Sequence, residues 1–165
     1  MLGNQVKSIY LAIGSNLGDK KKNIEKAKYK LIQNNITILN SSSFYESFSW
    51  PNPENPKFLN IVLKVTTNHK PLKLIEICKD IEKELGRKKK PKNAPRICDI
   101  DILDYENRVL EGELILPHPR MHIRSFVLLP LFEINKNWAH PGSNQHIKTL
   151  ISLLSNRDIR SIKQI

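Results

Sequence analysis

The sequence predicts an α+β fold with an antiparallel sheet. Segments with alternating apolar residues recur along the chain, and between them lie segments whose apolar residues have helical spacing. Over the first hundred or so residues these segments follow the order β-α-β-β-α-β, which is that of a ferredoxin-like split βαβ unit with both helices on one face. A chain of 165 residues is long enough for one domain with a real core, so we expect a single domain over residues 1–165.

The first strand is expected at residues 8–16, where "SIYLAIGSN" is an apolar run. The next turn, "GSNLGD", supplies glycines and ends at Asp19, a typical helix N-cap. It lacks the Lys-Ser/Thr ending of a P-loop, so we interpret it as a turn and cap. The helix that follows has the apolar residues Ile24, Ala27 and Leu31.

A second strand is expected at residues 36–47, and a loop rich in proline and asparagine follows at 49–57. Alternation then predicts a strand at 58–67. Pro71 is placed to open the second helix, and Gly86 stands where a C-terminal cap is expected. The apolar stripe of this helix consists of Leu74, Ile77, Cys78, Ile81 and Leu85.

The last strand of the unit is "DIDILDY" at 99–105. Beyond it, residues 105–110 suggest a turn into another short strand, residues 125–134 a helix broken at Pro130, and residues 146–154 the last helix. The tail, 155–165, has little patterning, so we expect it to be loosely held.

Composition excludes some classes of protein. Charged residues make up 26% and apolar residues 39%, without a long apolar run or a signal-type start, so we expect a soluble cytoplasmic protein without a membrane partner. Cys78 and Cys98 form no C-x-x-C pair and fall on predicted apolar faces, which favours buried free thiols. The net charge of +11 suits nucleic acid, an anionic membrane surface or a polyphosphate ligand, but lysine is spread along the whole chain and only its clustering at 86–96 is informative.

Two aspartates interrupt the apolar run of the strand at 99–105. In a strand Asp99 and Asp101 share one face while Cys98, Ile100 and Ile102 share the other. With roughly 3.3 Å of rise per residue, the two aspartate α-carbons lie about 6.6 Å apart, close enough to bind one divalent cation or a pair. A half-buried strand with a solvated outer face is the structural alternative, although aspartate is depleted in strands.

Four stretches together resemble one family. They are "YLAIGSNLGD", "NPKFLN", "LGR" followed by "APRICDIDIL", and "LPHPRMHIRSFVLLPLFEI", in register from Tyr10 to about Pro141. In this respect the chain is similar to 6-hydroxymethyl-7,8-dihydropterin pyrophosphokinase, an enzyme of folate synthesis. The resemblance implies an antiparallel sheet in an α/β/α sandwich. It also implies transfer of the terminal pyrophosphate of ATP to the pterin hydroxymethyl group, with release of AMP and use of two Mg²⁺ ions.

Carried onto this sequence, the resemblance makes Asp99 and Asp101 the magnesium ligands, with Arg96 beside the transferring group. Hard cations prefer carboxylate oxygens, and a pair of ions neutralises charge around the attacked phosphorus. Such catalysis consists mainly of positioning and charge stabilisation, so the lack of a Ser or Cys nucleophile motif does not count against an enzyme.

The pterin site is expected around Phe58 and Asn60, which share a strand face. Phe58 can stack on the ring, and Asn60 offers a donor and an acceptor to the ring edge. The resemblance adds Phe126 as a second stacking aromatic, a residue that would otherwise be assigned to the core. It also adds a lining loop with Ser47, Phe48 and Trp50, although the family often has Thr and Pro where this chain has Ser47 and Phe48.

The nucleotide site is expected to be basic, because a triphosphate needs cations. Taken singly, the lysines are ordinary solvated charges; Arg96 and Arg124 fall inside matched motifs, and Asn93 stands where some members have Trp. Glu82 matches a family position near the nucleotide, whereas nothing in the spacing of His122 and His140 makes a metal site. The expected ATP set is Glu82, Arg87, Lys89, Lys92, Arg96, Ile102, His118 and Arg124.

Two other readings stay open. A ferredoxin-like RNA-binding module fits the element order and the charge, but the aromatic-rich RRM pattern is missing and aspartates beside the ligand face repel phosphates. A catalytically idle scaffold would not need both aspartates and the stacking pair. We therefore expect a monomeric enzyme with small-molecule substrates, ATP and the pterin, and no nucleic-acid partner.

Overall fold

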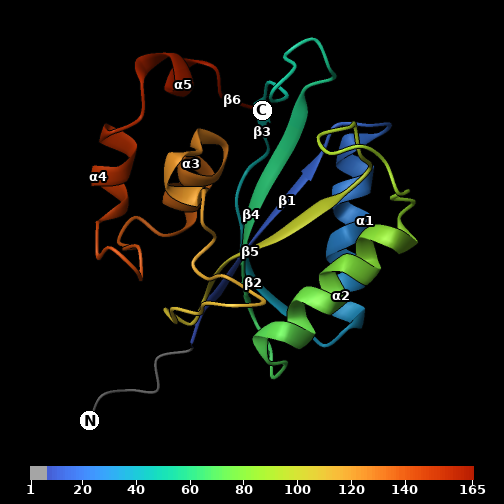
Figure 1. The fold of residues 1–165 in the computed structure, drawn as a ribbon, viewed down its shortest axis with the longest axis horizontal. Coiled ribbons are helices and arrows are strands. Elements are labelled where there is room, and N and C mark those ends of the chain that lie inside the picture. Colours follow the sequence, from blue (N-terminus) through green and yellow to red (C-terminus); the bar gives the residue numbers. More distant parts are fainter. Residues whose placement is uncertain (1–6) are drawn as a thin grey trace.

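A six-stranded sheet forms the centre of the computed structural model, which describes residues 7–165 (Figure 1). The main path of the sheet runs β5-β1-β4-β3-β6, β2 also pairs with β4, and every pairing is antiparallel. The strands are β1 (Ile9–Ser15), β2 (Thr37–Ser41), β3 (Tyr45–Ser47), β4 (Phe58–Thr66), β5 (Asp99–Tyr105) and β6 (Lys163–Gln164).

Helices cover both faces of this sheet. In Figure 1, α1 (Lys20–Gln33) and α2 (Pro71–Glu84) lie on one side, and α3 (Ser125–Ile134) and α4 (Ile147–Ser152) lie on the other. The predicted α/β/α sandwich is therefore confirmed. None of the helices within residues 7–165 is long and apolar enough to cross a bilayer.

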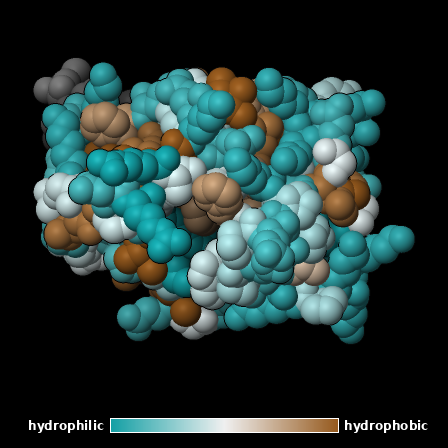
Figure 2. All heavy atoms as spheres, turned by 90° about the horizontal axis from the view of Figure 1, so that it is seen from above, coloured by the Kyte–Doolittle hydropathy of each residue, from teal (hydrophilic) through white to brown (hydrophobic). Residues whose placement is uncertain are grey.

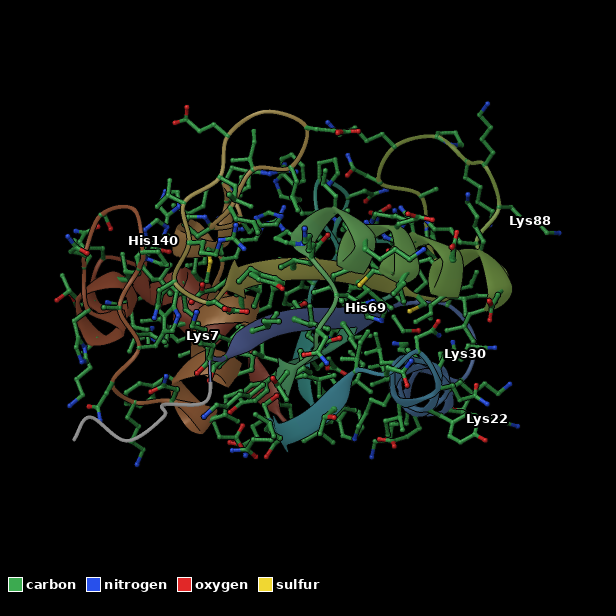
Figure 3. All side chains as sticks on the ribbon, turned by 90° about the horizontal axis from the view of Figure 1, so that it is seen from below. Lys7, Lys22, Lys30, His69, Lys88 and His140 are labelled. Carbon is green, nitrogen blue, oxygen red and sulfur yellow. The ribbon has the colours of Figure 1, made fainter. Side chains whose placement is uncertain are left out.

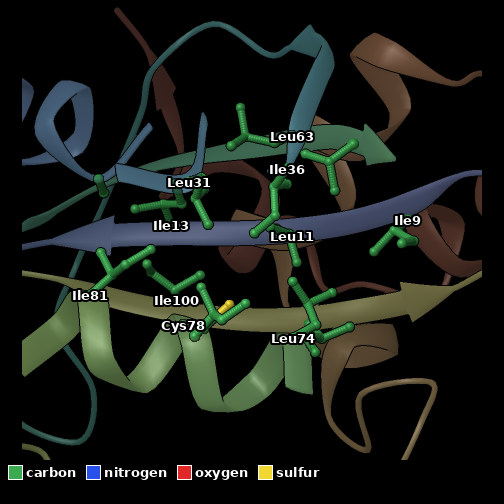
Figure 4. Close-up of a cluster of buried hydrophobic side chains, with 14 of the residues drawn as sticks. Ile9, Leu11, Ile13, Leu31, Ile36, Leu63, Leu74, Cys78, Ile81 and Ile100 are labelled. Carbon is green, nitrogen blue, oxygen red and sulfur yellow. The ribbon is translucent and has the colours of Figure 1, made fainter. Parts of the chain in front are cut away.

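The alternation along β1 builds two cores at once. Ile9, Leu11 and Ile13 pack under α1 and α2, while Tyr10 belongs to the cluster under α3. Figure 4 shows the first cluster, in which helix and strand residues meet at the sheet surface. Each fully buried aliphatic side chain of this kind stabilises the fold by roughly 1.5–3 kcal/mol relative to exposure. The predicted helical stripes supply the helix side of this core, including Ile24, Ala27, Leu31, Leu74, Ile77, Cys78 and Ile81.

Both cysteines are buried and free, as predicted. Burial raises the pKa of the Cys78 thiol to about 12, so it stays protonated at neutral pH.

The segment expected as one strand at 36–47 is divided in two. β2 pairs with the far half of β4 and β3 with its beginning, along the same edge. Between them, the Ser42 hydroxyl accepts the N–H of Val62 at 2.9 Å, in place of a backbone carbonyl. Because a side-chain hydroxyl replaces a backbone carbonyl as the acceptor, the regular hydrogen bonding between the strands is interrupted at Ser42.

Three expectations for the last third of the chain were wrong. Pro130 does not break α3: the helix continues past it to Ile134, Pro130 is buried, and its neighbours Leu128 and Leu131 pack in the second apolar cluster. Residues 106–107 form the expected turn after β5, but residues 108–110 form no strand; Leu110 makes a single bridge with Leu116. The helix α4 is not the last one, because α5 (Asn156–Arg160) follows it.

The tail is ordered instead of loosely held. Ser155 caps α5 by accepting the N–H of Asp158 at 3.1 Å. β6 then pairs with the edge of β3, and the N–H of Ile165 donates to Phe44 at 2.9 Å. The open edge of β3 thus provides a pairing partner for the tail, although the residue pattern of the tail itself does not predict a strand.

Candidate active site

A cavity of about 390 Å³ opens where β1 ends and β4 and β5 begin, beneath the basic loop at 86–96. Its walls come from the loop after α2, from β3 and the loop that follows it, and from the segment that leads into α3. Residues far apart in the sequence therefore meet at one place, at the sheet end that carries the aspartates.

The floor of the cavity is made by two small residues of β1. Gly14 lies opposite Asn60 on one side and Asp99 on the other, and Ala12 lies opposite Asp101. A Cβ on Gly14 would stand 3.3 Å from Asn60 Oδ1 and 3.4 Å from the Phe58 ring. Larger side chains here would fill the space between the aromatic residue and the aspartates.

Asp99 and Asp101 lie on the cavity side of β5, as the alternation predicts. Arg87 Nη1 lies 3.1 Å from Asp99 Oδ1, and Arg96 Nη1 lies 3.9 Å from Asp99 Oδ2. Asp101 has a weaker contact, 3.9 Å to His118 Nε2. Burial, followed by the neighbouring Asp99 carboxylate, raises the pKa of Asp101 to about 6.

These carboxylates fit a hard cation. The charge of Asp101 is only poorly compensated by the side chains around it, and a bound cation would stabilise it. No cluster of three or more His, Cys, Asp or Glu side chains suited to a metal occurs within residues 7–165. A site with two carboxylates is typical of Mg²⁺, which takes its other oxygens from water and substrate phosphates.

His118 faces this pair as a neutral ring. Burial, and then the charges of Arg124 and Arg120, lower its pKa to about 4. Its Nδ1 accepts the N–H of Arg120 at 3.1 Å, so in the neutral ring the proton is on Nε2, toward Asp101. His118 is thus a hydrogen-bond donor to the site and not a cation.

Arginines line the walls above the floor. The guanidinium carbon of Arg96 lies 5.5 Å from the centre of the Phe58 ring, and that of Arg124 lies 5.4 Å from the centre of the Phe126 ring. The Nε of Arg96 is buried and makes no hydrogen bond. A buried donor without a partner is costly, and an anionic ligand would satisfy it.

Lysines occur on several elements, and four of them line the cavity: Lys79, Lys88, Lys90 and Lys92. Figure 3 shows Lys7 just before β1, Lys22 and Lys30 on α1, and Lys88 in the loop after α2. The view in Figure 2 shows a mostly hydrophilic surface with apolar patches scattered over it.

The expected stacking face is formed by Phe58 and Asn60 of β4. The Asn60 amide donates to the Tyr45 carbonyl at 3.0 Å and to Ser47 Oγ at 2.9 Å. The N–H donors of the Asn60 amide are therefore already used, and only its oxygen is left to accept a hydrogen bond from a ligand. The sequence analysis expected Asn60 to offer a ligand both a donor and an acceptor. Phe48 and Trp50 are 50% and 69% exposed, so the lining loop presents two aromatic rings to solvent.

Asn16 is the main residue that the sequence analysis missed. It is buried, and its Nδ2 donates to Ser49 Oγ and to the Pro56 carbonyl, each at 3.2 Å. Its Oδ1 accepts the N–H of Arg96 at 2.8 Å. One side chain therefore joins the loop at 49–57 to the basic loop at 86–96.

The structure brings most of the expected residues to the cavity wall. Glu82, Lys89 and Ile102 are not among the lining residues; Glu82 is buried behind the wall, and Ile102 is in the core. Lys79 and Arg120 line it without having been expected. Arg120 lies within a matched stretch, so the motif itself was the available signal. The expected residues at the wall are Ser47, Phe48, Trp50, Phe58, Asn60, Arg87, Lys92, Arg96, Asp99, Asp101, His118, Arg124 and Phe126.

Comparison with known proteins decides the family. The model of the family described as 7,8-dihydro-6-hydroxymethylpterin-pyrophosphokinase matches residues 10–136, which include every expected site residue. The chain belongs to this family. A relative from Aquifex aeolicus, 2-amino-4-hydroxy-6-hydroxymethyldihydropteridine pyrophosphokinase, is 42% identical over 142 residues, 86% of this chain and 88% of the relative. The protein of that name from Bacillus subtilis is 40% identical over 127 residues, with 76% of each chain covered.

Other relatives are longer proteins. The Dictyostelium discoideum folic acid synthesis protein FOL1 is 41% identical over 148 residues, which are 89% of this chain and 22% of that protein. The chain thus spans about a fifth of the length of the first curated relatives it matches. A crystal structure of Plasmodium falciparum HPPK-DHPS superposes on 100% of this chain and on 48% of its own chain, with a TM-score of 0.75 at 16% identity. This likeness supports the fold described above for the present chain.

Proposed function

We propose that this chain transfers pyrophosphate from ATP to 6-hydroxymethyl-7,8-dihydropterin, giving the pterin diphosphate and AMP, a step of folate biosynthesis. One observation carries the proposal: the Phe58–Asn60 face and the Asp99–Asp101 face lie on either side of the small residues of β1. A flat ring on one face and a metal-bound polyphosphate on the other would place the two reacting groups over the same strand.

The residues then have distinct roles. Phe58 and Phe126 would hold the ring, and the oxygen of Asn60 would accept from its edge. Asp99 and Asp101 would hold two Mg²⁺ ions, which when bound neutralise charge on the phosphates. Arg96 and Arg124 would bind phosphate oxygens, because a guanidinium offers paired donors. No side chain has to form a covalent intermediate.

The proposal extends to the form, location and metal requirement of the protein. The chain acts as one domain and as a monomer, in the cytoplasm, and it requires magnesium. Its partners are the two small substrates.

The deciding experiment identifies the nucleotide product. With the pterin, ATP and magnesium we expect AMP, because attack at the β-phosphorus releases it, whereas attack at the γ-phosphorus releases ADP. Chromatography of the reaction against a chelator control measures this. ADP as the only product would overturn the reaction, and no turnover with tight, salt-sensitive RNA binding would favour an RNA-binding module.

Replacing Phe58 with alanine should weaken pterin binding by roughly 5- to 10-fold, since a stacked ring contributes about 1 kcal/mol beyond area burial. Phe126→Ala should act in the same direction. Separate titrations of pterin and of a nonhydrolysable ATP analogue measure the effect, which should be small for the nucleotide. Tyr29→Ala, at an exposed aromatic residue of α1, is the matched control. Equal losses for both ligands would mean that the ring supports the fold instead.

A further inference from the structure

Glu82 lies at the end of α2, behind the wall of the cavity. It is 2% exposed and does not line the cavity. A buried carboxylate is retained only where partners compensate its lost hydration. Its position therefore raises the question of what those partners are.

The first partner is the backbone of β5. Glu82 Oε1 accepts the N–H of Ile100 at 2.8 Å. Ile100 lies between Asp99 and Asp101, and within residues 7–165 β5 is an edge strand that pairs with β1 alone. The carboxylate thus supplies the acceptor that a further strand would have supplied. It fixes the backbone from which both aspartates project.

The second partner is Arg87. Its Nη1 lies 2.7 Å from Glu82 Oε2 and 3.1 Å from Asp99 Oδ1. One guanidinium nitrogen therefore bridges the buried Glu82 carboxylate and the half-buried Asp99 carboxylate. Lys79 Nζ adds a contact at 3.2 Å to Glu82 Oε1. Through Arg87, Glu82 also sets the direction of the Asp99 side chain.

We propose that Glu82 is a positioning residue of this site, which fixes the β5 backbone between the two aspartates and orients Asp99 through Arg87. The inference rests on the proposed function, because it takes Asp99 and Asp101 as the metal-holding pair. It differs from the expectation that Glu82 lies at the nucleotide, since a positioning residue acts on kcat and on the magnesium requirement. A nucleotide contact would act on the KM for ATP.

Two variants separate the two partners. Glu82→Gln keeps an oxygen for the Ile100 N–H but loses the charge facing Arg87, whereas Glu82→Ala loses both. We expect kcat for AMP formation to fall about 10-fold in Glu82→Gln and about 100-fold in Glu82→Ala, the range typical of groups that orient metal ligands. Half-maximal activity should require more magnesium, and the KM for pterin should stay within about twofold.

A spectroscopic readout tests the backbone contact without activity. Hydrogen exchange of the Ile100 amide, followed by NMR, should be fast in Glu82→Ala and near the wild-type rate in Glu82→Gln. Glu84→Gln is the matched control, because Glu84 lies two residues away in α2 and pairs with Lys30 on the exposed surface. It should change neither readout.

A double-mutant cycle tests the route through Arg87. In an Arg87→Gln background, Glu82→Gln should cost less than twofold in kcat, because its charged partner is already gone. Additive losses would overturn this route. A raised KM for ATP with unchanged kcat in both single variants would overturn the proposal as a whole.

Failure of the proposed function has a different signature. If the wild-type chain makes no AMP, the reaction is wrong, whatever the variants do. Unchanged Ile100 exchange in folded Glu82→Ala would then overturn the backbone contact separately. If Glu82→Ala does not fold, Glu82→Gln and the cycle still decide the matter.

Discussion

Asp101→Asn is expected to lower AMP formation by roughly 1,000-fold or more, about 4 kcal/mol of transition-state stabilisation, because metal-borne charge neutralisation is worth several kcal/mol. The fold should remain intact. Asp101 stands beside Asp99 and has only the distant His118 contact, so the free energy of unfolding without metal should be unchanged or slightly higher. Initial rates at saturating substrates and urea unfolding measure the two quantities.

The companion variants sharpen this result. Asp99→Asn should also abolish activity, but without a gain in stability, because Asp99 faces the two guanidinium groups of Arg87 and Arg96. Asp80→Asn, on the exposed side of α2, is the control and should keep full activity. An Asp101→Asn protein with near wild-type turnover would remove the aspartate pair from the mechanism.

Asn16→Ala is expected to have the second largest effect, since one side chain holds two loops. The change removes one partner from Ser49, from the Pro56 carbonyl and from the Arg96 N–H. Ser49 and Pro56 stay bonded to each other, so the Arg96 N–H is the group left unsatisfied, and we expect a loss of about 1–3 kcal/mol in the free energy of unfolding. The rate of AMP formation should fall by about 100-fold, because a shift of Arg96 by about an ångström would misplace its guanidinium group relative to the reacting phosphate.

The pattern of kinetic constants makes this test specific. Both KM values should rise together with the loss of kcat, because the loops on the two substrate sides lose their common support. Asn52→Ala, in the exposed part of the loop, provides the control. A change confined to the pterin KM would show that Asn16 supports only its own side of the cavity.

The sequence predicts those parts of the site that strand periodicity controls. Asp99 with Asp101, and Phe58 with Asn60, could be assigned to shared faces because alternation fixes which side a residue occupies. The role of Asn16 could not be read, because its partners lie 33 to 80 residues away. Glu82 follows the apolar residue Ile81 in α2, and nothing in a helical stripe shows which strand edge such a residue meets.

The errors in the fold have the same origin. A hydroxyl at Ser42 divides a strand that the apolar pattern shows as continuous. The tail forms β6 because β3 offers an open edge, which is a property of the assembled sheet and not of residues 155–165. Where an element depends on its own periodicity, the prediction is confirmed; where it depends on a distant partner, it is not.

The two small residues of β1 have a thermodynamic consequence. Gly14 and Ala12 separate the aromatic face from the aspartate face. Under the proposed function, each ligand, once in place, would therefore become part of the other's binding surface. Linkage then requires reciprocity: whatever factor the nucleotide adds to the affinity for pterin, pterin adds to the affinity for the nucleotide. A pterin analogue would therefore bind more tightly in a cell rich in ATP than to the empty protein, and a compound that spans both faces would gain from their proximity without any change in the protein.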